Sequence, residues 1–148
     1  NRKIEALGLL AGIQANAALS DEIRRDAFAT EIQFLQMSGQ DPQSVSAGLD
    51  DIYSRALLAW PQAHRLRYQY AMRLFSQGQV RQALDELRTV LQSAPADVDA
   101  LNAYGYTLAK EMDRPRSAFK TLEQAFLIAP NRAGVFNTKW LATIEVLP

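Results

Sequence analysis

The chain has 148 residues, of which 48% are hydrophobic and 22% charged, a balance typical of a folded globular domain. Its 16 basic and 16 acidic side chains cancel, so no net positive field favours binding to nucleic acid or to an anionic membrane. The absence of cysteine excludes disulfides, thiolate catalysis and cysteine-based zinc or iron–sulfur sites, and only one histidine is present. We therefore expect no metal site and no cofactor.

No stretch of the sequence approaches the roughly 18 consecutive apolar residues that a membrane-spanning helix needs. The longest candidate, Ile4 to Leu19, is interrupted by Glu5 and Gln14. The chain starts with Asn1 rather than methionine, so we expect a processed form or a piece of a longer protein. The compartment, whether bacterial periplasm, envelope or cytoplasm, stays open.

Taken in chain order, the pattern predicts helices almost throughout, because prolines and a few glycines separate stretches with helical periodicity. The expected helices span residues 2–18, 21–37, 43–60, 62–76, 80–92, 98–111 and 115–128. Ser20 is expected to cap the second helix, and Gly39 and Gly78 are expected to follow helix ends. For the tail from Arg132 to Leu147 we favour a terminal helix, with a strand as the alternative.

A repeat of 34 to 35 residues is the main signal in the sequence. The small residues Ala71 and Gly105 are 34 apart. Four further pairs are 35 apart: Ala83 and Ala118, Leu87 and Leu122, Val90 and Ala125, and Pro95 and Pro130. The extra residue falls in the turn around Met112 and Asp113, where an insertion costs little.

The repeated positions predict how paired helices pack. A small residue midway along the first helix lets the second helix approach closely, and leucine fills the groove between the two. Each pair leaves an apolar face that a neighbouring pair must cover. The sequence therefore predicts an all-α array of helix hairpins.

Two stretches, Leu66 to Pro95 and Val98 to Pro130, resemble the tetratricopeptide repeat (TPR) family. The best match is Leu101-Asn102-Ala103-Tyr104-Gly105-Tyr106-Thr107-Leu108-Ala109, followed by Ala118 and Ala125-Phe126-Leu127-Ile128-Ala129-Pro130. With its lengthened turn, this version is similar to repeats of bacterial envelope-associated TPR proteins. The resemblance implies antiparallel helix hairpins stacked as a short right-handed α-solenoid.

The expected organisation is a single helical repeat domain over residues 1–148. Its parts are an N-terminal helix (1–20), a degenerate repeat (21–61), two regular repeats (62–95 and 96–130) and a C-terminal capping segment (131–148). The first repeat is degenerate because Leu49 stands where a small alanine is expected, and because its turn is too long. Residues 1–20 and 131–148 do not fit the repeat pattern.

In TPR proteins the first helices line a concave face that holds a partner peptide or helix, so the resemblance implies partner-binding residues there. The candidates are Arg65, Tyr68, Gln69, Met72, Asp99, Asn102, Tyr106 and Lys110. Tyrosine, methionine and arginine are favoured at protein interfaces. The alternative is that Tyr68 and Tyr106 are core residues and that Arg65 and Lys110 are only solvated.

One TPR subtype is argued against by the residues at these positions. Members that bind chaperones clamp a C-terminal carboxylate with lysine, arginine and asparagine. The corresponding positions hold Tyr68, Met72 and Ala103, and only Asn102 is suitable. We therefore expect a protein or peptide partner without a carboxylate clamp.

No catalytic constellation is evident. His64 lacks a serine-and-acid partnership in the sequence, Asp97 precedes Val98 as a helix-start residue, and the isolated glycines form no phosphate loop. We predict a protein-binding scaffold or adaptor that is not an enzyme and does not bind nucleic acid. The alternatives are a structural or oligomerisation module, in a homo-oligomer or a larger complex, and a regulatory domain of a longer enzyme.

Overall fold

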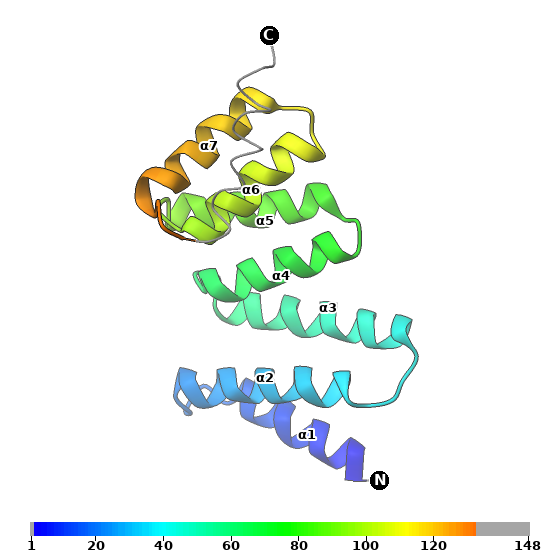
Figure 1. The fold of residues 1–148 in the computed structure, drawn as a ribbon. Helices are drawn as coiled ribbons and strands as arrows, with labels where there is room; N and C mark the ends of the chain where they lie inside the picture. The colour runs from blue at the N-terminus through cyan, green and yellow to red at the C-terminus, as the bar shows by residue number, and fades with distance from the viewer. Residues whose placement is uncertain (1, 133–148) are drawn as a thin grey trace. The chain divides into compact units, whose positions relative to one another are not determined.

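In the computed structural model of the chain, residues 2–132 are described, and they form seven helices and no strand (Figure 1). The helices are α1 (Arg2–Ala15), α2 (Asp21–Gln36), α3 (Pro42–Ala59), α4 (His64–Ser76), α5 (Val80–Ser93), α6 (Val98–Lys110) and α7 (Pro115–Ile128). The predicted all-α fold class is confirmed. The predictions for the capping segment and the terminal helix fall on residues 133–148 and lie outside the described residues.

The contacts divide the chain into two compact units, one of residues 1–61 and one that starts at Gln62. In the first unit α1 packs on α2 and α2 packs on α3. In the second unit α4 packs on α5, α5 on α6, and α6 on α7. The short turns within the pairs make each pair antiparallel. The expectation of one domain over residues 1–148 stays a prediction.

Capping side chains fix several helix starts. The Ser20 side chain accepts a hydrogen bond from the Ile23 N–H, as predicted, and Asp97 accepts one from the Ala100 N–H at 3.0 Å. Asp41 caps α3 by accepting from the Ser44 N–H at 2.9 Å. These side chains satisfy amides that have no partner within their own helix.

Turn residues end the helices where the backbone must leave the right-handed region. Gly39 and Gly78 have φ angles of 66° and 73°, which suits the glycines expected at these ends. The inserted residue of the last turn, Asp113, also has a positive φ, of 48°. Aspartate tolerates this conformation better than most residues, which is why the insertion is accommodated there.

The first helix ends at Ala15 rather than at the expected Ala18. The Asn16 side chain accepts a hydrogen bond from the Ala18 N–H at 3.0 Å, and this local turn competes with continuation of the helix. The fourth helix likewise starts at His64 rather than at Gln62. Both differences concern local turns whose geometry the periodicity of apolar residues does not encode.

The degenerate repeat brings its helices together at a different glycine. A Cβ atom on Gly48 would lie 2.6 Å from the Leu35 Cδ2, so Leu35 of α2 packs directly over the glycine backbone of α3. Leu49, at the position expected to be small, is buried with a relative exposure of 6%. The close approach has therefore moved by one residue along the second helix of this pair.

A polar cluster joins all three helices of the first unit. The Arg55 guanidinium on α3 donates to Gln14 Oε1 of α1 at 2.7 Å and to Glu31 Oε1 of α2 at 2.9 Å. Gln14, with a relative exposure of 5%, also donates to Glu31 at 2.6 Å, and Asp51 accepts from Arg55 Nε at 2.8 Å. Because Gln14 is buried and the Glu31 side chain is only 16% exposed, the hydrogen bonds that these two residues accept from Arg55 are costly to lose.

Replacing Arg55 with alanine is expected to lower the stability of the first unit by about 1–3 kcal/mol, because Gln14 and Glu31 lose a charged donor. Urea unfolding followed by circular dichroism measures the change. Arg88→Ala is the matched control, since Arg88 pairs with Asp85 at an exposed position and should change stability by less than about 1 kcal/mol. Equal effects of the two substitutions would contradict the structural role of the cluster.

The core of the second unit is built on the repeated positions. Ala71, Leu87, Val90 and Ala100 form one fully buried cluster. Val98, Leu101 and Ala125 form a second. The Gly105 backbone lies against Leu122, whose Cγ would be 2.7 Å from an added Cβ atom. The positions that repeat in the sequence are therefore those at which the helices touch.

Candidate functional site

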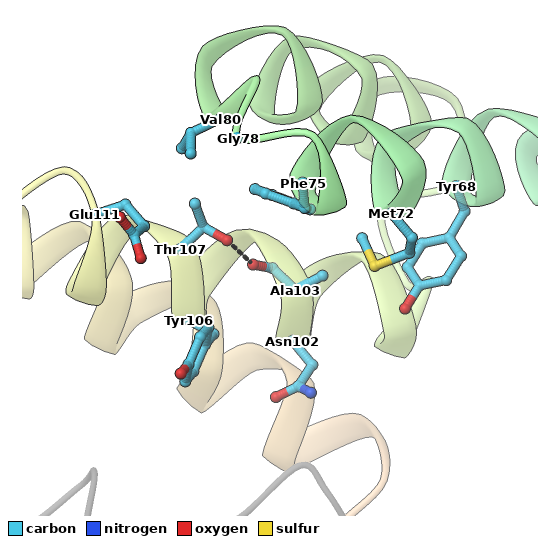
Figure 2. Close-up of a pocket in the computed structure, with 10 residues that line it drawn as sticks. All are labelled: Tyr68, Met72, Phe75, Gly78, Val80, Asn102, Ala103, Tyr106, Thr107 and Glu111. Atoms are coloured by element: carbon cyan, nitrogen blue, oxygen red, sulfur yellow. Dashed lines mark hydrogen bonds between the residues drawn. The ribbon is translucent and has the colours of Figure 1, made fainter. Parts of the chain in front are cut away.

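A cavity of about 550 Å³ opens between α4 and α6 in the second unit (Figure 2). Its walls come from four places: α4, the turn after it, the start of α5, and α6 with the residue that follows it. The lining residues are Tyr68, Met72, Phe75, Gly78, Val80, Asn102, Ala103, Tyr106, Thr107 and Glu111. Both long walls belong to the first helices of their pairs.

The α4 wall is apolar and rests on the core. Tyr68, Met72 and Phe75 follow one another at spacings of four and three residues, which places them on one face of the helix. All three are partly buried and pack against the cluster of Ala71, Leu87, Val90 and Ala100. They extend from α4 toward α6 in Figure 2. This wall is therefore held in place by the fold rather than by a ligand.

The α6 wall combines an aromatic ring with a carboxamide. Asn102 and Tyr106 are four residues apart and project from the same side of α6 (Figure 2). Tyr106 has a relative exposure of 41%, far more than a core tyrosine would show. The Lys110 ammonium lies 5.5 Å from the centre of the Tyr106 ring, within the range of a cation–π contact. An exposed aromatic ring beside an apolar cavity can stack on an incoming side chain.

Some polar groups of the cavity are hydrogen-bonded within the protein, and others are presented to the cavity. The Thr107 hydroxyl donates to the Ala103 carbonyl at 2.8 Å, so its proton serves the helix itself. Burial raises the pKa of the Tyr68 hydroxyl above its ordinary value, and the negative charges of Asp99 and Asp97 raise it further. Tyr68 therefore stays protonated, and Asn102 presents both a donor and an acceptor at the cavity.

Of the eight residues expected on the concave face, the structure brings four together around this cavity: Tyr68, Met72, Asn102 and Tyr106. The other four are not among its lining residues. Arg65 and Gln69 are exposed on α4, and Asp99 forms an ion pair with Arg132 at 3.0 Å. The fourth, Lys110, contacts two lining residues, because its ammonium lies 5.5 Å from the centre of the Tyr106 ring and 3.9 Å from Glu111 Oε1. A role of any of the eight in partner binding stays a prediction.

Six lining residues were not among those expected from the sequence: Phe75, Gly78, Val80, Ala103, Thr107 and Glu111. Phe75 could have been found, because it lies seven residues after Tyr68 and therefore on the same helix face. Thr107 and Glu111 gave no such signal, since polar residues near a helix end are common on any surface. Their placement depends on the turn at Gly78, which brings the start of α5 close to the end of α6.

A basic cluster of four side chains lies on α4, namely His64, Arg65, Arg67 and Arg73, and two of these side chains have partners on α5. Arg67 forms an ion pair with Glu86 of α5, and both side chains are largely buried. His64 Nδ1 lies 3.1 Å from the Ser93 hydroxyl. These contacts join α4 to α5, so the cluster does not act as one free basic stripe.

The described part of the chain holds no group of three or more histidine, aspartate or glutamate side chains that could bind a metal ion. None of its helices combines the length and the apolar character that crossing a bilayer requires.

The structure resembles that of YrrB, described as a TPR protein with an unusual peptide-binding site, with a TM-score of 0.55 and 20% sequence identity. The chain has a TPR fold. The match covers 80% of this chain but only 65% of YrrB, so the chain spans less than two thirds of its length. No model of a known protein family and no curated protein matches the sequence. At this identity, the likeness to the TPR protein concerns the fold.

Proposed function

We propose that the chain is a protein-interaction module and not an enzyme, and that the cavity between α4 and α6 receives a segment of a partner polypeptide. The observation that carries this proposal is the cavity itself. It is large enough for one bulky side chain and lies on the first helices of two consecutive TPR pairs. Its apolar floor is fixed by the core, so little conformational freedom is lost on binding.

The lining residues favour a particular ligand chemistry. Tyr68, Met72, Phe75 and Tyr106 favour an aliphatic or aromatic anchor side chain, because methionine and aromatic rings adapt to such groups. The Asn102 carboxamide can bond both the N–H and the C=O of an extended backbone. The peptide-binding site named for YrrB supports the same class of ligand by analogy of fold.

The test uses a displayed library of random peptides selected on the immobilised chain, followed by fluorescence anisotropy with the selected peptides. Tyr106→Ala is expected to weaken binding about tenfold or more, because truncating an aromatic anchor at an interface costs about 2 kcal/mol. The exposed Gln92→Ala on α5, outside the cavity, is the control and should leave binding unchanged.

The test can contradict the proposal in the following way. Selected peptides that bind the Tyr106→Ala and Met72→Ala variants as tightly as the original chain would place the site elsewhere. Loss of helicity in either variant, seen by circular dichroism, would instead mean that the substitution had disturbed the fold. In that case Tyr106→Phe, which keeps the ring, should restore binding.

A further inference from the structure

The helix α1 carries the packing pattern of a second helix of a TPR pair. Ala6, Leu10 and Ile13 have the same spacing as Ala83, Leu87 and Val90 of α5, and as the corresponding residues of α7, which are Ala118, Leu122 and Ala125. Ile13 stands seven residues before the cap Ser20, and Val90 stands seven before the cap Asp97. Both the pattern and its distance to the next helix therefore agree.

The three positions differ sharply in burial between these helices. In α5 all of them have a relative exposure of 0%, and in α7 none exceeds 7%, because α4 and α6 cover them. In α1 all three are only partly buried. Because first and second helices alternate along the chain and α4 and α6 are first helices, α1 takes the place of a second helix, and no described helix precedes it.

Leu9 lies on the side of α1 that a first helix would cover. Its equivalent on α5, three residues after the repeated alanine, is Glu86, which faces α4 and forms an ion pair with Arg67. Leu9 is 70% exposed, a high value for a leucine beside a helix interface. A helix that covered α1 would thus meet leucine rather than glutamate, and would need an apolar residue where α4 has arginine.

We propose that α1 is the second helix of a repeat and that its open face, made of Ala6, Leu9, Leu10 and Ile13, binds a first-type helix that precedes α1 in the same polypeptide. This helix has a small residue at the centre of its contact, like Ala71 and Gly105. It also has an apolar residue opposite Leu9. Binding removes the leucine and isoleucine side chains from water, each CH₂ group contributing about 0.8 kcal/mol when fully buried.

The first test supplies such a helix to the whole chain. Residues 62–79, containing α4 and its turn, are joined ahead of Lys3 in place of the first two residues, with Arg67→Leu in the added copy. The spacing from the added alanine to Ala6 then equals that from Ala71 to Ala83. We expect the thermal midpoint of unfolding to rise by about 5 °C or more. The same extension with Ala71→Glu in the added copy is the matched control and should give no rise.

The second readout is the accessibility of Leu9. The chain has no cysteine, so a Leu9→Cys variant can be labelled with a maleimide at a single position. We expect labelling to slow at least tenfold in the extended chain and to stay unchanged for Glu22→Cys on the exposed side of α2. Equal midpoints and equal labelling rates for the extension and its Ala71→Glu control would overturn the proposal.

A second copy of the chain is the competing occupant. If Leu9→Cys is already protected in the unextended chain, and light scattering shows a dimer that Leu9→Glu dissociates, the face joins two copies and the proposal is wrong. The natural sequence ahead of α1 gives a further check. It should contain a helix with a small residue 12 or 13 positions before Ala6, the spacings found for Ala71 with Ala83 and for Gly105 with Ala118. Its absence would also overturn the assignment.

Discussion

Leu87→Ala is expected to destabilise the second unit by about 2–5 kcal/mol, enough to unfold much of it in a marginally stable protein. Leu87 has a relative exposure of 0% and lies in the cluster that joins α4, α5 and α6. Removing its branched end leaves a void between three helices, and neighbouring alanine side chains such as Ala71 and Ala100 are too small to fill it.

Urea unfolding followed by the helical circular dichroism signal measures this effect. Leu127→Ala on α7 is the matched control, because Leu127 is 75% exposed and its truncation should change stability by less than about 0.5 kcal/mol. Similar midpoints for the two variants would show that the contact between the helices does not depend on the repeated leucine.

Gly105→Ala is expected to destabilise the chain although alanine is the better helix former. The helical preference for alanine over glycine is worth about 1 kcal/mol. Against this, the added Cβ would lie 2.7 Å from Leu122 Cγ and 3.3 Å from the Ala118 carbonyl oxygen. Overpacking of this kind costs about 1–3 kcal/mol, because backbone on α7 must move. We expect a net loss of up to about 2 kcal/mol, and a larger loss for Gly105→Leu.

Gly12→Ala on α1 provides the matched control for this substitution. It makes the same chemical change in a helix where nothing lies within 4 Å of the added Cβ. Here the helical preference acts alone, and stability should rise by up to about 1 kcal/mol. Urea titration of both variants gives the comparison. A rise for both would mean that α6 and α7 can separate without cost.

The sequence was sufficient to predict much of the helix arrangement in the second unit, because local preferences and contacts between helices favour the same structure there. The small residues Ala71 and Gly105, the leucines Leu87 and Leu122 and the glycine turn at Gly78 each favour the same arrangement. In the first unit local preferences and contacts between helices do not coincide. The bulky Leu49 occupies the position where a small residue was expected, and the helices approach each other at Gly48 instead. The polar cluster around Arg55 joins residues up to 41 positions apart in the chain.

The same reasoning predicted only part of the candidate site. Helical spacing and the TPR resemblance pointed to Tyr68, Met72, Asn102 and Tyr106, which do line the cavity. Spacing and resemblance could not distinguish these lining residues from Arg65, which is exposed and does not line the cavity. That distinction depends on the angle at which the two first helices meet, and the angle results from the packing of every residue between them.

The sequence by itself determined the all-helical class and, in the second unit, the pairing of helices and the residues at which they touch, because each follows from short-range periodicity and from a repeat that fixes the spacing of small and large side chains. Only the tertiary structure decided which polar groups are buried together, which faces of the first helices form the cavity, and which face of α1 is left open. These features depend on contacts between residues distant in the chain, and their energies come from burial that no local pattern encodes.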